Sequence, residues 1–303
     1  MDTYSFEGRV AVVTGAGRGI GRAYALLLAQ RGARVVVNDL GSSMQGVGVD
    51  GSVAATVASE IEAAGGTAIP DEHDVSSTAG AQALIAAAIE RFGRLDALIN
   101  NAGIIKWAGL PDADLDNLER HLAVHVHGSF NTTRAAWPHM VEQGYGRIVM
   151  TTSSGIFGLP QNLSYATAKA AVIGLTRSIA TTSTAHGIKV NLIAPAAFTR
   201  MAGQADTDAA SSAGPPMSPD LVAPMAAFLA HEACPVNGEL YEAGAGRFSR
   251  VFIASTPGYV TADATIEEVA AHWDEINDER GYTVPTDLPD WSTTFLAHLQ
   301  AEA

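Results

Sequence analysis

The stretch VAVVTGAGRGIGRAYALLLAQRGARVVVND, residues 10–39, decides the fold. An apolar run, a loop with spaced glycines, a helical segment and a second apolar run follow one another in it. Gly15 permits a tight turn after the first strand, Gly19 permits close approach of the backbone to a pyrophosphate, and Gly21 lets the helix pack on the sheet. The first N–H groups of that helix are donors for phosphate oxygens. The stretch therefore predicts a dinucleotide-binding site between the first strand and the first helix.

Asp39 follows the second strand and favours NAD as the dinucleotide. An acid at this distance after the glycine loop bonds the ribose hydroxyls of the adenosine half, and its charge repels the 2′-phosphate of NADP. Arg18, inside the loop, acts in the opposite direction because a guanidinium attracts that phosphate. The residue after Asp39 is Leu40, which adds no second cation. On balance the sequence predicts NAD.

The rest of the chain alternates short β-branched runs with Ala-rich segments of helical periodicity. The strand runs are continuously apolar, as in parallel strands that are covered on both faces. We predict strands at 10–13, 34–38, 67–69, 95–99, 147–151, 189–193 and 239–242, and helices at 20–30, 53–63, 82–91, 115–141, 165–184 and 221–230. This pattern predicts the α/β class: a Rossmann-type, doubly wound parallel sheet of about seven strands with helices on both faces.

The alternation ends near Gly246 and suggests two parts. Residues 1–246 are expected to form one dinucleotide-binding domain that also contains the substrate site. Residues 247–303 are expected to form a C-terminal extension, with one helix at 266–276, packed on the core or on a partner subunit. Residues 201–220, beyond a strand end, are interpreted either as a lid over the substrate or as a disordered surface loop.

Composition excludes several classes of protein. The formal net charge of −14 and the isoelectric point near 4.9 argue against binding to nucleic acid or to anionic membrane. No apolar run has the 18 or more residues that a spanning helix needs, and the N-terminus has no apolar signal core. A single cysteine, Cys234, is typical of a reducing compartment. We therefore expect a cytoplasmic protein without nucleic-acid or membrane partners.

The segment SYATAK, residues 164–169, places Tyr165 and Lys169 on one face of a predicted helix. Alone, this pair is more typical of a solvated helix surface than of an acid–base pair. It occurs, however, in order with T-G-x-x-x-G-x-G at 14–21 and N-N-A-G at 100–103. Together these motifs resemble the short-chain dehydrogenase/reductase family over residues 8 to about 246. The resemblance implies that Tyr165 is the acid/base and that Lys169 is its electrostatic partner and ribose anchor.

The resemblance also implies further contacts with the dinucleotide and a homodimer or homotetramer. These cofactor contacts are expected from Ile20, Asp74, Val75, Asn101, Ala102, Gly103 and Pro195, in addition to the glycines, Arg18, Asp39, Tyr165 and Lys169. Asp74 has two interpretations. It either bonds the adenine amino group or caps a helix that starts near Ser76.

The proposed acid/base chemistry requires a change in the pKa of Tyr165. Free tyrosine titrates at ~10, about three units above neutral pH, a gap of roughly 4 kcal/mol. The ammonium of Lys169 and the positive charge of an oxidised nicotinamide both favour the phenolate, and we expect them to close this gap. The resemblance also implies a hydroxyl near residue 152 that holds the substrate oxygen. The family's usual spacing to the tyrosine indicates Thr152, whereas counting from the start of the family's corresponding strand indicates Ser153. We predict Ser153, because loops absorb deletions more readily than strands, and keep Thr152 as the alternative.

The family usually has an asparagine in a V-N-x-x-G pattern, where this chain has VHVHG and places His125. With several longer stretches, this change resembles the (3R)-hydroxyacyl-CoA dehydrogenase branch of the family, found in peroxisomal multifunctional enzymes. His125 is expected to relay a proton through a water to Lys169 or to have a structural role. His121 and His125 share a helix face and suggest a zinc alternative, but no nearby acid or cysteine completes a ligand set, so we predict no metal.

These observations predict an NAD-dependent oxidoreductase that interconverts a small-molecule secondary alcohol and a ketone, with a 3-hydroxyacyl-CoA as the expected substrate. A hydroxysteroid is the alternative substrate. A protein that senses NAD without turnover is the alternative from another class. Coenzyme A carries phosphates, and Lys106 and Arg200 are the cations that the sequence places near the pocket mouth.

Overall fold

The computed structural model of the chain describes residues 4–199, 217–262 and 264–301. The chain divides into two compact units, Met1–Arg250 and Val251–Ala303. The boundary lies four residues beyond the predicted one at 246/247, because a further strand follows Gly246. Residues 201–216 of the predicted lid at 201–220 lie outside the described residues, as does Arg200.

The first unit contains an eight-stranded sheet with the order β3-β2-β1-β4-β5-β6-β7-β8. Strands β1 to β7 pair in parallel. The strands are β1 (Val10–Thr14), β2 (Arg34–Asn38), β3 (Thr67–Asp71), β4 (Ala97–Asn100), β5 (Gly146–Thr151), β6 (Ile188–Ala196), β7 (Leu240–Gly244) and β8 (Arg247–Val251). The predicted doubly wound α/β fold is thus confirmed. Its strand order reverses beside β1, where ligands bind in such folds.

Strand β8 is the element of the sheet that the sequence pattern does not predict. Its residues, RFSRV, are half-buried or exposed, so the continuous apolar run that identifies the other strands is missing. A turn at Ala245 and Gly246 connects it to β7, and both residues have positive φ angles, 50° and 77°. Two successive residues of this kind form the tight turn that is typical of a β-hairpin.

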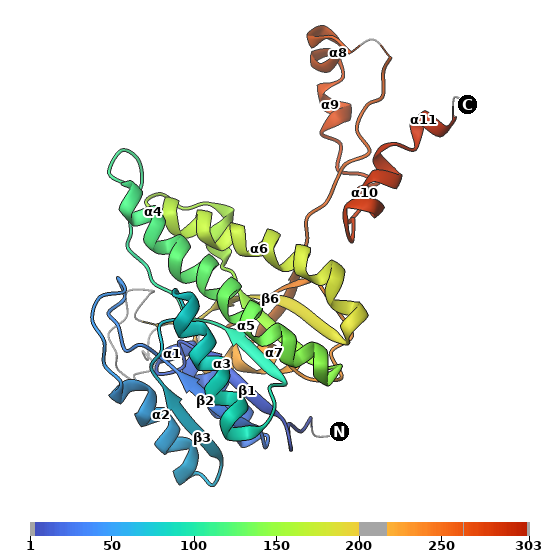
Figure 1. The fold of residues 1–303 in the computed structure, drawn as a ribbon. Coiled ribbons are helices and arrows are strands. Elements are labelled where there is room, and N and C mark those ends of the chain that lie inside the picture. Colours follow the sequence, from blue (N-terminus) through green and yellow to red (C-terminus); the bar gives the residue numbers. More distant parts are fainter. Residues whose placement is uncertain (1–3, 200–216, 263, 302–303) are drawn as a thin grey trace. The chain divides into compact units, whose positions relative to one another are not determined.

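Helices cover both faces of the sheet (Figure 1). On one face α1 contacts α2 and α7, and on the other α3 contacts α5 while α4 contacts α6. The helices are α1 (Gly19–Gln30), α2 (Ser52–Ala63), α3 (Thr78–Phe92), α4 (Leu115–His121), α5 (Gly128–Gln143), α6 (Leu163–Ser183) and α7 (Ala223–Leu229). Short turns are η1 (Leu122–His127), η2 (Ser154–Phe157), η3 (Thr184–His186) and η5 (Pro219–Leu221). Among the residues described, no helix is long and apolar enough to cross a membrane.

The predicted helix at 115–141 consists of three segments, because α4 and α5 are joined by the π-helical turn η1. A π-turn widens the helix locally and is frequent at functional sites. Here it contains His125, whose side chain is buried.

The second unit, Val251–Ala303, has short helices and one isolated bridge between Ser255 and Thr283. The helices are α8 (Ile266–Ala271), α9 (Trp273–Ile276), α10 (Leu288–Phe295) and α11 (His298–Ala301). The predicted helix at 266–276 therefore corresponds to α8 and α9, which are separated by His272. None of the residues whose burial is described in this unit is buried, so its described part contains no hydrophobic core.

Candidate active site

The parallel strands bring the predicted site residues to one edge of the sheet. In a parallel sheet the carboxyl ends of the strands lie together, so loops that are distant in sequence become neighbours. Gly15 follows β1, Asp39 follows β2, Asp74 follows β3, Asn101–Gly103 follow β4, Ser153 follows β5, and Pro195 lies near the end of β6.

The glycine loop and the N-N-A-G segment are joined by hydrogen bonds. The hydroxyl of Thr14 accepts the N–H groups of Asn101 and Ala102, both at 3.0 Å. The Asn101 side chain donates to the carbonyl oxygens of Thr14 and Gly15, at 3.0 and 3.1 Å. A Cβ on Gly15 would lie 2.8 Å from Cα of Ala102. The two motifs therefore form one structural unit, and Thr14, which was not among the predicted site residues, holds it together.

The start of α1 has the features of a phosphate site. A Cβ on Gly21 would lie 2.1 Å from the carbonyl oxygen of Gly15, so only glycine lets the loop fold back this closely. Arg18 occupies the N-cap position and makes no side-chain bond to the helix end. The loop is thus open to a ligand at the positive end of the helix. Gly19, with φ of 52°, faces the side chain of Thr199, while Ile20 is half-buried in the first turn. These residues fit a dinucleotide.

The carboxylate of Asp39 accepts hydrogen bonds from the backbone of the glycine loop and of the segment that follows β2. One oxygen accepts the N–H of Gly17 at 2.9 Å, and the other accepts the N–H of Gly41 at 2.7 Å. Arg18 donates to the carbonyl oxygen of Ser42 at 3.4 Å. Asp39 therefore lies against the glycine loop, at the predicted place, and Arg18 is directed toward the segment that follows Asp39.

Asp74 does not cap the helix that follows it. Helix α3 is capped by Ser77, whose hydroxyl accepts the N–H of Gly80, while Asp74 accepts the N–H of Ser76 at 2.8 Å. The capping interpretation is therefore wrong, because α3 begins at Thr78, two residues later than expected. Asp74 is exposed, and Val75 beside it is buried. A contact of Asp74 with adenine stays a prediction.

The structure brings Ser153, and not Thr152, beside Tyr165. The hydroxyl of Ser153 acts on the phenol of Tyr165 and favours its ionised form. A Cβ added to Gly155 would lie 3.3 Å from Oγ of Ser153 and 3.6 Å from Cε1 of Tyr165, so both side chains lie next to this glycine. Thr152 is buried, and its hydroxyl donates to the backbone oxygen of Lys169 at 2.8 Å. Thr152 therefore holds α6 against β5 and does not face the phenol.

Lys169 is buried beside Tyr165. Its Nζ lies 5.7 Å from the centre of the Tyr165 ring and donates to the carbonyl oxygen of Thr151 at 2.8 Å. Burial lowers the pKa of Lys169 to about 7. Burial also raises the pKa of Tyr165, and the Ser153 hydroxyl opposes this shift. Lys169 is not among the groups that shift the pKa of Tyr165, so burial dominates and the pKa is raised.

His125 lies between the N-N-A-G segment and Tyr165. Its Nε2 is 2.9 Å from the carbonyl oxygen of Ile104, and its ring meets that of Tyr165 edge to face, with centroids 5.3 Å apart. A Cβ on Gly103 would lie 2.6 Å from Cε1 of His125. Burial, with Lys169 as a second cause, holds the pKa of His125 well below its usual value. The imidazole is therefore neutral. Its Nδ1 is buried and has no hydrogen-bond partner among the described residues.

Hydrogen bonds to the backbone hold the side chain of His121 in place. Its Nδ1 lies 2.7 Å from the carbonyl oxygen of Asn117, and its Nε2 accepts the N–H of Lys106 at 3.3 Å. Its ring stacks on that of His125 at 5.9 Å. In the described part of the chain, no group of three or more His, Cys, Asp or Glu side chains is arranged to hold a metal. Two histidines on one helix face are here part of the packing around Tyr165.

Residues 9–210 match the model of a protein family described as short chain dehydrogenase. This match covers more than half of the chain. The chain belongs to the short-chain dehydrogenase family. The family consists of oxidoreductases that act on CH–OH groups and generally use NAD or NADP, typically as oligomers that bind small-molecule substrates. The predicted family resemblance is therefore confirmed.

Three known proteins are similar to this chain in sequence or in structure. It is 39% identical over 293 residues to mouse peroxisomal multifunctional enzyme type 2, covering 94% of this chain and 39% of that protein. The full-length Drosophila melanogaster enzyme of the same name has a similar structure, with 33% identity and a TM-score of 0.80 over 98% of this chain and 50% of that one. A 7α-hydroxysteroid dehydrogenase, complexed with NADH and 7-oxo glycochenodeoxycholic acid, has 30% identity and a TM-score of 0.70 over 80% and 95% of the two chains. The chain thus spans 39% of the mouse multifunctional enzyme and 50% of the Drosophila one.

Two cations of this dehydrogenase lie beside His121 near the site. Lys106 and Arg120 both lower the pKa of His121, after burial, and both side chains are exposed. Lys106 was predicted, whereas Arg120 was missed, because nothing in the local sequence of α4 distinguishes it. The acidic residues Asp112, Asp114, Asp116 and Glu119 flank the two cations in the chain.

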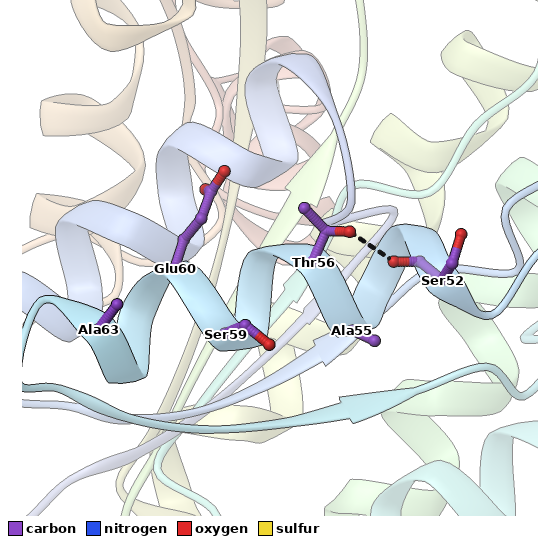
Figure 2. A pocket seen from close by; sticks show the side chains of 6 residues that line it. All are labelled: Ser52, Ala55, Thr56, Ser59, Glu60 and Ala63. Atoms are coloured by element: carbon purple, nitrogen blue, oxygen red, sulfur yellow. Dashed lines mark hydrogen bonds between the residues drawn. The ribbon is translucent and has the colours of Figure 1, made fainter.

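A separate hollow lies on the outer face of α2 (Figure 2). Its lining comes from a single helix and consists of Ser52, Ala55, Thr56, Ser59, Glu60 and Ala63. Thr56 donates to the carbonyl oxygen of Ser52 at 2.8 Å, and Glu60 pairs with Arg22. None of the predicted site residues lines this hollow.

The lowered pKa of Lys169 predicts a pH-dependent stability of the ligand-free dehydrogenase. Between pH 7 and the unfolded pKa near 10.4, the unfolded chain binds more protons at this site than the folded chain, so stability rises with pH. We expect the free energy of unfolding to gain on the order of 2–3 kcal/mol from pH 7 to pH 9 through this group. Denaturant unfolding of the wild type and of Lys169→Met measures it. The slope should largely vanish in Lys169→Met and persist in the exposed control Lys106→Met. Equal slopes in all three proteins would contradict the shift.

Proposed function

We propose that this chain is an NAD-dependent oxidoreductase that interconverts a secondary alcohol and a ketone, with a 3-hydroxyacyl-CoA as its substrate. The observation that carries the proposal is the arrangement of Tyr165 between Ser153 and Lys169, at the sheet edge that also holds the glycine loop. A protein that senses NAD has no need of a buried phenol and a buried amine at this edge.

Each of these side chains has a role in removing or adding hydrogen at an alcohol carbon. Ser153 holds the substrate oxygen by a hydrogen bond, and Tyr165 takes the proton of the alcohol or returns it to the ketone. Lys169 is the anchor for the ribose, and in its protonated form it favours the phenolate over the phenol. A bound oxidised dinucleotide would supply the acceptor for the hydride and a positive charge, which would oppose the rise in pKa that burial imposes on Tyr165.

Asp39 supports NAD over NADP. Its carboxylate lies at the glycine loop and bonds Gly17 and Gly41, so a 2′-phosphate on the ribose would meet a negative charge. We expect kcat/KM to be at least about tenfold higher with NAD than with NADP, which corresponds to roughly 1.4 kcal/mol of repulsion. In Asp39→Asn, which keeps the size of the side chain and one acceptor oxygen, the ratio should shift about tenfold toward NADP. A wild type that prefers NADP would contradict this assignment.

The substrate class is supported by the likeness to peroxisomal multifunctional enzyme type 2 and by the exposed cations Lys106 and Arg120. The structure with a bound 7-oxo bile acid favours a hydroxysteroid as the second candidate. Absorbance at 340 nm, followed with NAD and a panel of 3-hydroxyacyl-CoA thioesters, hydroxysteroids and simple secondary alcohols, separates them. Turnover confined to steroids would favour the second candidate. Tight NAD binding with no turnover of any alcohol would favour the sensor.

Ser153 is expected to contribute directly to turnover. Ser153→Ala should lower kcat about a hundredfold, because the hydrogen bond to the reacting oxygen is strongest in the transition state. Thr152→Val should instead lower the free energy of unfolding by about 1 kcal/mol, through loss of its bond to Lys169, with a smaller effect on kcat. Steady-state kinetics and denaturant unfolding of the two variants measure these effects. The opposite pattern, with full turnover in Ser153→Ala and its loss in Thr152→Val, would assign the role to Thr152.

The proposal also includes the oligomeric state of the protein and its compartment in the cell. We propose a homodimer or homotetramer in the cytoplasm, which sedimentation of the purified protein and fractionation of cells would test. The single cysteine, Cys234, is buried, in keeping with a reducing compartment.

A further inference from the structure

Exposed apolar side chains gather beside the catalytic residues. Trp107 and Leu110 belong to the loop after β4, and Phe157, Leu159 and Leu163 belong to the segment after Ser153. Their exposed fractions range from 46% to 81%. We call these five residues the apolar rim. Isolated exposed apolar residues are common on proteins, but a group from two segments at one site indicates a binding surface.

The two segments of the apolar rim are joined by backbone contacts. Ala108 forms a bridge with Asn162, and the N–H of Leu163 donates to the carbonyl oxygen of Ala108 at 3.2 Å. A Cβ on Gly109 would lie 3.1 Å from the backbone of Gln161. The loop after β4 therefore lies directly against the segment before α6, so the rim is one surface.

The apolar rim is continuous with the reacting side chains. Phe157 ends the turn η2, which begins directly after Ser153, and Leu163 is in the first turn of α6 together with Tyr165. Residues 153–168 include no charged side chain. Lys106 precedes Trp107, so a cation stands at the edge of the rim. A ligand whose reacting oxygen lies at Ser153 thus has an apolar surface next to it.

We propose that the apolar rim binds the hydrocarbon part of the substrate and that the enzyme thereby selects 3-hydroxyacyl groups by chain length. This inference rests on the proposed function, because it assumes an alcohol bound at Ser153 and Tyr165. Its new content is the assignment of chain-length selection to the rim. Short chains reach the catalytic side chains without covering the rim, whereas longer chains cover it and remove its apolar surface from water.

The expected effect follows from the burial of methylene groups. A methylene that is fully buried strengthens binding about fourfold, and one that is covered on a single side strengthens it about twofold. Because the rim is an open surface, we expect kcat/KM to rise roughly fourfold for each added pair of methylenes, until the chain extends beyond the rim.

The test is the dependence of kcat/KM on chain length for 3-hydroxyacyl-CoA thioesters of four to twelve carbons. A second series, the 2-alkanols from butanol to decanol, carries the same tails without coenzyme A. Leu159→Ser and Phe157→Ser should flatten the rise with chain length and leave the four-carbon thioester within about threefold of the wild type. Phe130→Ser, at an exposed phenylalanine on α5 outside the rim, should keep the full rise.

The outcomes separate this inference from the proposed function. Turnover of the four-carbon thioester with no rise along either series overturns the role of the rim and leaves the proposed function in place. A rise with the alkanols but no turnover of thioesters overturns the coenzyme A assignment and supports the rim. If Leu159→Ser and Phe157→Ser change the sedimenting mass and not the chain-length dependence, the rim is an interface between copies, and the inference is wrong. Absence of turnover with every alcohol overturns both.

Discussion

Replacement of Tyr165 by phenylalanine is expected to lower kcat by about a hundredfold to ten-thousandfold, the usual contribution of a positioned acid or base. The variant loses the phenolic oxygen and keeps the ring. The ring contacts with His125 and His121, at centroid distances of 5.3 and 6.2 Å, therefore remain. Binding of NAD should stay close to that of the wild type, because the glycine loop is untouched.

Steady-state rates and the affinity for NAD, measured on the same preparation of Tyr165→Phe, separate chemistry from binding. Tyr145→Phe is a suitable control, since that ring stacks with Arg9 and Arg147 and stands apart from the predicted site residues. It should turn over at the wild-type rate. A fall in kcat that came with an equal loss of NAD affinity would indicate a structural defect and not the loss of an acid/base.

Gly21→Ala is expected to weaken binding of the dinucleotide at least about a hundredfold, because the loop must move by roughly 1 Å. The new Cβ would lie 2.1 Å from the carbonyl oxygen of Gly15 and 2.5 Å from Nδ2 of Asn101. Neither atom can move alone, because Asn101 also bonds Thr14 and Gly15. Overpacking of this kind should also lower the free energy of unfolding by about 1–3 kcal/mol.

Gly174→Ala is the matched control for this substitution. Gly174 also lies within a helix, α6, and a Cβ there would meet no atom within 4 Å. Replacing glycine by alanine in an open helix interior stabilises the fold by roughly 0.5–1 kcal/mol. Denaturant unfolding should therefore show a lower free energy of unfolding in Gly21→Ala and a higher one in Gly174→Ala. Calorimetric titration with NAD measures the affinity of both variants for the dinucleotide. Unchanged NAD affinity in Gly21→Ala would contradict the role given to the loop.

Much of the fold could be predicted from the sequence, because buried parallel strands are continuously apolar. The runs Val10–Thr14 and Arg34–Asn38 are recognisable for this reason. Strand β8 was missed because it pairs at the edge of the sheet, where polar side chains are tolerated. The π-turn at Leu122–His127 was missed as well, since its residues have the same periodicity as the helices that flank it.

The candidate site, like the fold, could be predicted only in part from the sequence. Motif order placed the glycine loop, Tyr165 and Lys169 at the correct edge of the sheet. Spacing indicated Thr152 and strand register indicated Ser153, which was predicted; the structure distinguishes them by the bond of Thr152 to the backbone of Lys169 and by the action of Ser153 on the phenol of Tyr165. The pKa of Lys169 was not foreseen, because it depends on burial by distant parts of the chain. A linear pattern contains little information on desolvation.

The central claim is that Tyr165 exchanges the proton of the alcohol. The pH dependence of kcat/KM, measured in parallel for the wild type and Tyr165→Phe, tests it most directly. For alcohol oxidation by the wild type, the logarithm of kcat/KM should rise with pH with a slope of about one and then level off, as the coupled pair of phenol and lysine loses one proton. The residual rate of Tyr165→Phe should lack this step. If the variant retains the same step at the same pH, another group accepts the proton and the account is contradicted.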